Sequence, residues 1–156
     1  MEIVLIRHGR PEAAINQKVD ALGYLAWIKE YNRSLVVDGP SDVPVSLHRY
    51  AKVFAVSSDL PRAIHSAELV LGRGPDAQLA SLCEVDIPVY RLPFTLHTYT
   101  WLYLNRGLWL LGCKGQFESF SSAKGRAEAA AEQLIDLARV HDQVVVFGHG
   151  LMNRFI

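Results

Sequence analysis

Residues 1–12 read MEIVLIRHGRPE, and in them an apolar run at residues 3–6 is followed directly by an arginine, a histidine and a glycine. A continuous β-branched run of this length is typical of a strand that is buried on both faces of a parallel sheet. Two similar runs follow at residues 53–56 and 144–147. The three runs therefore predict three parallel strands of one central sheet.

Helix signals alternate with these runs. Residues 61–71 carry Pro61 in the first turn and are followed by Gly72, which is a typical helix stop. Residues 122–140 carry an apolar stripe at helical spacing, and a weaker strand is expected at residues 78–82. Strands that alternate with helices predict an α/β fold, here a three-layer α/β/α sandwich with a mainly parallel sheet.

The composition is that of a single domain over residues 1–156. Sixteen Lys and Arg balance sixteen Asp and Glu, so the net field is too weak to recruit nucleic acid or an anionic membrane by itself. Cys83 and Cys113 form no CxxC pair, and we expect two buried, reduced thiols. The N-terminus lacks the basic start and the length of a signal peptide, so a cytoplasmic location is expected.

The stretch from residue 92 to residue 111 is apolar and aromatic enough to raise the question of a membrane span. His97, Asn105 and Arg106 interrupt it, and Gly107 is expected to break it near its middle. We therefore predict a variable lid segment around residues 86–117, with a contact in a homodimer as the alternative use of its apolar surface.

Three polar side chains follow the three predicted strands. His8 and His149 each come two residues after a run, and Arg62 comes six residues after another. The carboxyl ends of parallel strands lie at one edge of a sheet, where open α/β sheets bind ligands. A single histidine near a strand end is usually structural, but three such placements favour a shared site. Burying two imidazoles beside arginines places like charges together, which destabilises the fold unless an anion binds there. We therefore expect a phosphoryl group as the ligand.

Four motifs carry a resemblance that spans the chain in order: RHG at residues 7–9, SSDLPRAIHSAEL at 57–69, ESFSSAKGR at 118–126 and VVVFGHG at 144–150. In this order the motifs closely resemble the histidine phosphatase superfamily, the phosphoglycerate mutase-like proteins. The resemblance implies the phosphoglycerate mutase-like version of the predicted fold. It also implies that His8 is a nucleophile, which forms a phosphohistidine.

The resemblance further assigns site residues. His149 would stabilise the transition state, and Glu84 matches the position of the proton donor in mutase-type members, with Asp86 as the nearest substitute. Gly150 stands where some members carry an acid. No metal or cofactor is expected, because no histidine shows HxH or HExxH spacing. The phosphate-binding residues implied are Arg7, Gly9, Arg62 and Gly150.

The leading hypothesis is a metal-independent phosphatase that acts on small phosphate monoesters. The alternatives are a phosphohistidine protein phosphatase and an inactive member that binds a phosphorylated ligand. Mutase activity is disfavoured, because residues after Gly9 and after Glu84 depart from that branch. Four aromatic residues of the lid segment could favour an apolar or aromatic leaving group, or could simply pack on the domain: Tyr99, Trp101, Tyr103 and Trp109.

Overall fold

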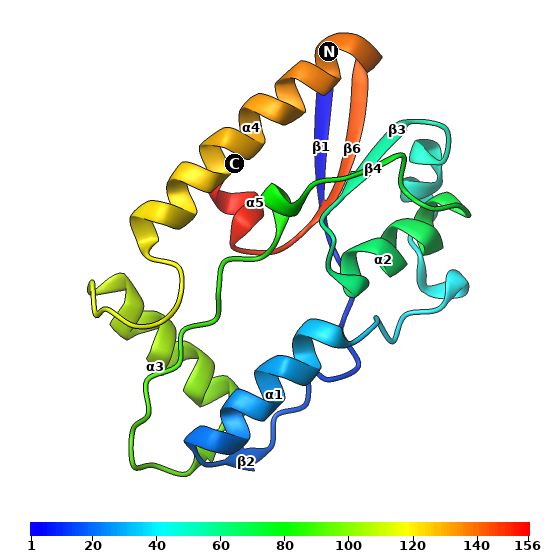
Figure 1. Cartoon of the computed structure of the whole chain (residues 1–156). Coiled ribbons are helices and arrows are strands. Elements are labelled where there is room, and N and C mark those ends of the chain that lie inside the picture. Colours follow the sequence, from blue (N-terminus) through cyan, green and yellow to red (C-terminus); the bar gives the residue numbers. More distant parts are fainter.

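The central sheet has four parallel strands in the order β1-β6-β3-β4 (Figure 1). The structure is a computed structural model that describes all residues, 1–156. It confirms the three predicted parallel strands. The weaker strand is only two residues long, because residues 80–82 form a 3-10 turn instead of continuing the ladder. The strands are β1 (Glu2–Arg7), β6 (Gln143–Gly148), β3 (Phe54–Ser57) and β4 (Ala77–Gln78).

Two helices cover the opposite faces of this sheet. Val145 and Phe147 of β6 pack in one core cluster with the buried side of α2 (Pro61–Leu71). Val144 and Val146 point the other way and pack against α4 (Phe120–His141). This alternation follows from the two-residue period of a strand and makes β6 buried on both faces. The predicted three-layer sandwich is therefore confirmed.

Local signals in the sequence set the ends of these helices. Gly72 has a φ of 68° and ends α2 in the left-handed conformation, which glycine adopts without steric cost. The Ser119 side chain accepts a hydrogen bond from Ser122 N–H and so caps the first turn of α4. Both helices match the predicted segments to within two residues.

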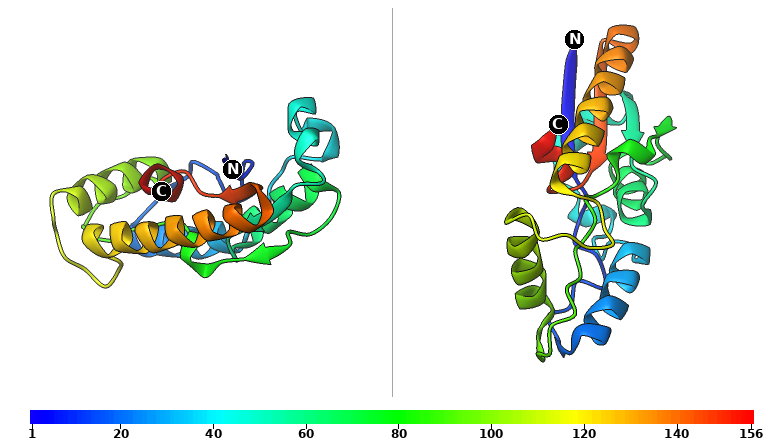
Figure 2. Two further views of the ribbon diagram at one scale, coloured as in Figure 1. Left: turned by 90° about the horizontal axis from the view of Figure 1, so that it is seen from above. Right: turned by 60° about the vertical axis from the view of Figure 1, so that its left-hand side comes forward.

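A second group of elements lies beyond the carboxyl ends of the strands (Figures 1 and 2). Its antiparallel pair β2-β5 and its two helices are held by a core of stacked aromatic side chains, including Tyr24, Trp27 and Trp101. Helix α1 was not expected from the sequence, and Gly107 does not break α3 as expected. The elements are β2 (Lys18–Val19), α1 (Ala21–Arg33), β5 (Leu96–His97) and α3 (Thr98–Leu110).

The remaining elements are short. Two 3-10 turns, Pro40–Asp42 and Val45–Tyr50, connect α1 to β3, and α5 (Met152–Phe155) follows β6. None of the helices is both long and apolar enough to cross a membrane. Both cysteines are free thiols, but they are not buried as expected: Cys83 is half-buried and Cys113 is exposed.

Candidate active site

The carboxyl edge of the sheet brings four of the predicted residues together. Arg7 ends β1, and His8 N–H continues the strand ladder by donating to the Gly148 carbonyl at 3.0 Å. His149 follows directly after β6, and its ring centroid lies 5.0 Å from that of His8. Arg62, from the first turn of α2, donates from Nε to His8 Nε2 at 3.2 Å. We call these four residues, Arg7, His8, Arg62 and His149, the nest.

His8 is held as a neutral imidazole with a defined tautomer. Its Nδ1 lies 2.6 Å from the Gly9 carbonyl oxygen, which can only accept, so Nδ1 carries the proton. Burial lowers the pKa of His8 to about 4; the Gly9 carbonyl opposes this shift, and the positive charges of Arg62 and Arg7 add to it. Nε2 therefore keeps its lone pair at neutral pH, as a nitrogen nucleophile requires.

Arg62 is a fully buried cation without a carboxylate partner. Its Nη1 donates to the Tyr31 carbonyl at 3.1 Å and to Asn32 Oδ1 at 3.4 Å, and its guanidinium lies 4.8 Å from the centre of the Tyr31 ring. Its Nη2 is buried and has no hydrogen-bond partner. Burial lowers the pKa of Arg62, yet a guanidinium stays protonated in proteins. An unpaired guanidinium N–H of this kind can donate a hydrogen bond to a bound anion.

His149 lies behind His8 and is fully buried. The Ser58 hydroxyl oxygen is 2.6 Å from its Nε2, whereas its Nδ1 has no partner. Burial lowers the pKa of His149 to about 2, and the positive charge of Arg62 acts in the same direction. His149 is therefore a neutral ring in the folded protein at neutral pH.

Two glycines make room at the nest. A Cβ on Gly150 would lie 3.2 Å from Nε and 3.3 Å from Cζ of Arg7, so a side chain there would displace the guanidinium. A Cβ on Gly9 would collide with the Asp38 carboxylate, and the Gly9 N–H donates to Ser66 Oγ at 3.0 Å. The predicted glycines thus permit close approach of polar groups to the sheet edge.

Glu84 reaches the same cavity as His8, and Asp86 does not. The Glu84 carboxylate accepts backbone hydrogen bonds from Val85 and Met152, both at 3.0 Å, and from Leu151 at 3.3 Å. Asp86 instead accepts from Glu118 N–H at 2.9 Å on an exposed side of the chain. Of the two candidate carboxyl groups, only Glu84 lines the cavity that contains His8.

The motif at residues 118–126 fixes the backbone of the segment that carries Glu84. Arg126 forms a bidentate ion pair with Glu118, at 2.9 and 2.7 Å. The same guanidinium donates to the carbonyls of Ser81 and Cys83 at 2.9 and 2.7 Å, and so fixes the segment that ends in Glu84. This pair holds the proton-exchange candidate in place without touching the cavity.

The main cavity has a volume of about 690 Å³ and opens at the nest. Arg62 and His149 lie behind its wall, in contact with His8. Sequence reasoning missed the contribution of α1 and the cations Arg10, Arg106 and Arg154, because their positions on the wall depend on how the second group of elements folds. The lining residues are Arg7, His8, Gly9, Arg10, Pro11, Ala14, Trp27, Tyr31, Glu84, Ile87, Tyr99, Leu102, Tyr103, Arg106, Gly150, Leu151 and Arg154.

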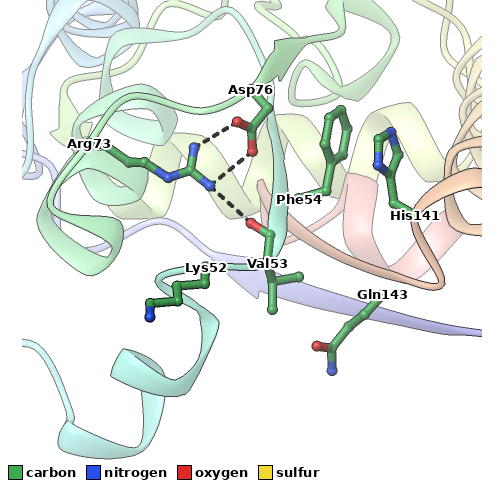
Figure 3. A pocket seen from close by; sticks show the side chains of 7 residues that line it. All are labelled: Lys52, Val53, Phe54, Arg73, Asp76, His141 and Gln143. Carbon is green, nitrogen blue, oxygen red and sulfur yellow. Dashed lines mark hydrogen bonds and ion pairs between the residues drawn. The ribbon is translucent and has the colours of Figure 1, made fainter.

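A second hollow, of about 400 Å³, lies at the opposite, amino edge of the sheet (Figure 3). Arg73 there pairs with both oxygens of Asp76 at 2.8 and 3.0 Å and also donates to the Val53 carbonyl. The ring of His141 stacks on Phe54 at 3.7 Å. We call this second cavity the amino-edge hollow. No group of three or more His, Cys, Asp or Glu side chains is placed to hold a metal ion.

Comparison with protein families gives a match over most of the chain. Residues 41–156 match the family described as the histidine phosphatase superfamily (branch 1). This range includes Arg62, Glu84 and His149, whereas the RHG motif at residues 7–9 lies before it. No curated protein matches the sequence.

Solved structures of three proteins share the fold. An alpha-ribazole phosphatase from Shigella flexneri superposes with a TM-score of 0.61 at 18% identity, over 97% of this chain and 75% of that chain. A phosphoserine phosphatase variant from Entamoeba histolytica, in complex with phosphoserine, gives 0.57 at 18%, over 98% and 76%. A phosphoglycerate mutase from Bacillus anthracis gives 0.59 at 18%, over 98% and 76%. The predicted phosphoglycerate mutase-like fold is confirmed.

Proposed function

Because this chain belongs to the histidine phosphatase superfamily, we propose that it hydrolyses phosphate monoesters without a metal ion, through a phosphohistidine on His8. The observation that carries this proposal is the state of His8. Its ring is neutral, its Nδ1 proton is held by the Gly9 carbonyl, and its Nε2 lone pair lies 3.2 Å from Arg62. A phosphate oxygen can replace Nε2 as the acceptor for Arg62, which frees the lone pair to attack phosphorus.

In the first step, His8 Nε2 attacks phosphorus opposite the leaving oxygen, so that an N–P bond forms as the P–O bond breaks. The ring becomes positively charged, and the hydrogen bond from Nδ1 to the Gly9 carbonyl stabilises that charge. Arg7 lines the cavity and donates to the phosphoryl oxygens directly. Arg62 Nη2 and His149 Nδ1 have no partner in the protein and are buried behind His8, so they become donors as His8 gives up its contact with Arg62. These donors stabilise the negative charge of the transition state.

The leaving oxygen takes a proton from Glu84, the carboxyl group on the cavity wall. In the second step, water attacks phosphorus, gives its proton to the Glu84 carboxylate, and breaks the N–P bond to return neutral His8. The three backbone hydrogen bonds leave one lone pair of Glu84 Oε2 free for these transfers.

Hydrolysis is proposed over phosphoryl transfer to a second hydroxyl. Two of the three structural neighbours described above are phosphatases by name, and one is a mutase. A mutase must shield its phosphoenzyme from water, whereas the cavity here is open and large for a phosphate, at about 690 Å³. Access of water to the phosphohistidine supports the hydrolase.

The test is to trap the intermediate. The protein is mixed with a ³²P-labelled aryl phosphate in EDTA and quenched, and we expect protein-bound label that is stable to base and labile to acid. His8→Ala should abolish both the label and the turnover. His141→Ala, which removes an exposed histidine from the amino-edge hollow, is the matched control and should keep both. Equal labelling of His8→Ala and the wild type would overturn the proposal.

A Glu84→Gln variant tests the proton transfer. With an alkyl phosphate, whose leaving group needs a proton, we expect kcat to fall by about 10² to 10⁴-fold. With a phosphoramidate, whose leaving nitrogen departs more readily, the fall should be small. A variant that keeps full activity on alkyl phosphates would remove Glu84 from the mechanism and favour the phosphohistidine protein phosphatase instead.

A further inference from the structure

A row of three aromatic rings begins at the nest and runs along the main cavity. The Arg62 guanidinium lies 4.8 Å from the Tyr31 ring, Tyr31 lies 5.2 Å from Trp27, and Trp27 lies 6.3 Å from Tyr99. All three aromatic residues line the cavity. We call Tyr31, Trp27 and Tyr99 the aromatic row. The aromatic row therefore lies beside the alcohol portion of a phosphate ester whose phosphoryl group is bound by Arg62.

The hydrogen-bond donors of two of the three rings are already engaged within the protein. Trp27 Nε1 donates to the Ala13 carbonyl at 2.8 Å, and the Tyr99 hydroxyl donates to the Ala14 carbonyl at 2.8 Å. Both hydrogen bonds hold the rings against the loop that follows the nest. Trp27 is only 2% exposed and backs the row, whereas Tyr31 and Tyr99 are half-buried and present mainly ring carbon to the cavity, which favours apolar and aromatic ligands.

Helix α3 extends this apolar wall. Tyr99, Leu102 and Tyr103 line the cavity at spacings of three and four residues, which places them on one face of the helix. Trp101 is buried in the aromatic core of the second group of elements, and Trp109 is buried against Ala123 and Ala127 of α4. Of the four aromatic residues singled out in the sequence, only Tyr99 and Tyr103 therefore line the cavity.

The cation on the same helix face is already engaged. Arg106 donates to the carbonyls of Asp86 and Val85 at 3.0 and 3.3 Å, and its guanidinium lies 4.9 Å from the Trp109 ring. Its hydrogen bonds hold the segment that follows Glu84. On α3 the side chains free to contact a ligand are therefore Tyr99, Leu102 and Tyr103, while the other cations of the wall, Arg10 and Arg154, come from other segments.

We propose that the alcohol portion of the substrate is a large aromatic or ring-bearing apolar group that lies against the aromatic row. This inference rests on the proposed phosphatase function and names its substrate class. A polyol or an amino-acid side chain in the same place would bury hydroxyl or amino groups against carbon without partners, which is unfavourable. An aryl or arylalkyl group buries its own carbon surface there and gains ring-to-ring contacts.

The test compares phosphate esters whose leaving groups have similar acidity but different size. The pairs are 2-naphthyl against phenyl phosphate, and benzyl against ethyl phosphate. We expect the larger member of each pair to have a kcat/KM about tenfold higher, because the extra ring is buried on the row. Equal kcat/KM values within both pairs would overturn the inference.

Substitutions in the cavity wall test which side chains cause the preference for the larger ester. Tyr99→Ala should lower kcat/KM for 2-naphthyl phosphate about tenfold and leave ethyl phosphate within twofold, whereas Tyr99→Phe, which keeps the ring, should retain the preference. Leu102→Ala is a second variant of the same wall in case Tyr99→Ala fails to fold. Tyr90→Ala is the matched control, since the Tyr90 ring packs on Phe117 outside the cavity. A loss of the preference in Tyr90→Ala, or its retention in both wall variants, would contradict the placement.

Failure of the proposed function would look different. A wild type that hydrolyses none of the four esters refutes the phosphatase and leaves the cavity as a binding site. Titration calorimetry with 2-naphthyl and ethyl phosphate then decides the inference. About tenfold tighter binding of 2-naphthyl phosphate, lost in Tyr99→Ala, supports the aromatic site, and equal affinities overturn it.

Discussion

The two edges of the central sheet use the same kinds of side chain in opposite ways. At the amino edge, Arg73 is paired with both oxygens of Asp76, and His141 stacks on Phe54 (Figure 3). At the carboxyl edge, Arg62 has no carboxylate partner and keeps one buried nitrogen without any hydrogen bond. An arginine in a hollow is therefore not a binding residue by itself. The informative feature is a buried donor that the fold leaves unpaired.

The same contrast separates the ion pairs of α4 from the nest. Arg126 holds Glu118 and two backbone carbonyls, and all of these partners come from the chain. The nest has arginines and neutral imidazoles but no facing carboxylate within ion-pair distance. A phosphoryl group has the charge and the oxygens to pair with these donors, which is the role that the proposed function gives it.

The strongest way to break this comparison is a matched pair of conservative substitutions, Arg62→Lys and Arg73→Lys. A lysine keeps the charge and loses the planar fork of donors, so Arg62→Lys should lower kcat/KM for an aryl phosphate by about 10² to 10³-fold. Arg73→Lys should leave kcat/KM unchanged and lower the free energy of unfolding by at most about 1 kcal/mol, because its ion pair is exposed.

Steady-state kinetics and urea unfolding of both variants measure these effects side by side. If Arg73→Lys lowered kcat/KM as much as Arg62→Lys, the amino-edge hollow would have to be part of the active site, and the contrast between paired and unpaired donors would lose its meaning.

The sequence predicted the carboxyl edge well because its signals are local. An apolar run fixes a strand, the strand ends fix where His8 and His149 lie, and a proline with a following glycine fixes the helix that carries Arg62. Each of these steps depends on neighbours along the chain. Parallel pairing then brings the separate ends to one edge.

The walls of the cavity could not be predicted in the same way. The apolar periodicity of α1 is weak, because Gly23 and polar residues interrupt it. The burial of α1 depends on the stacking of Tyr24 against Trp101, which is more than seventy residues away along the chain. The identity of the cavity-facing side of α3 depends on that same packing. Long-range aromatic contacts, rather than periodicity, decide which residues of α3 line the cavity.

A second prediction concerns the pH dependence of folding. The pKa values of His8 and His149 are lowered, to about 4 and about 2, mainly by burial. Below pH 6.5 the unfolded chain binds protons at both rings and the folded chain does not, so stability falls as the pH falls. Each ring should cost about 2 kcal/mol of unfolding free energy between pH 7 and pH 5.

Urea unfolding at the two pH values measures this loss. His8→Gln and His149→Gln should each show a shallower dependence on pH than the wild type, whereas His141→Gln at the amino edge should keep the wild-type dependence, because that side chain is exposed. A wild type whose stability is unchanged from pH 7 to pH 5 would mean that the two rings are not buried in their neutral forms.

The smallest expected effect concerns how the fold orients His149. Ser58 Oγ lies 2.6 Å from His149 Nε2 and accepts a hydrogen bond from Leu60 N–H at 3.3 Å, so its own proton is free for Nε2. We expect the hydroxyl to donate to Nε2, which would leave the ring proton on Nδ1, the buried atom without a partner in the protein. Ser58 is thus a positioning residue, and Ser58→Ala should lower kcat about tenfold, with little change in KM, by the loss of one hydrogen bond.

Nitrogen chemical shifts of His149 provide the readout that a merely structural role would not move. They should report a proton on Nδ1 in the wild type and a mixture of tautomers in Ser58→Ala, and Ser58→Thr should restore both the signal and kcat. Ser81→Ala, which removes an exposed hydroxyl that donates to Gln133, is the control and should change neither. If Ser58→Ala kept the wild-type tautomer and kcat, the orientation of His149 would have to come from packing alone, and the carboxyl edge would resemble the amino edge more closely than its unpaired donors indicate.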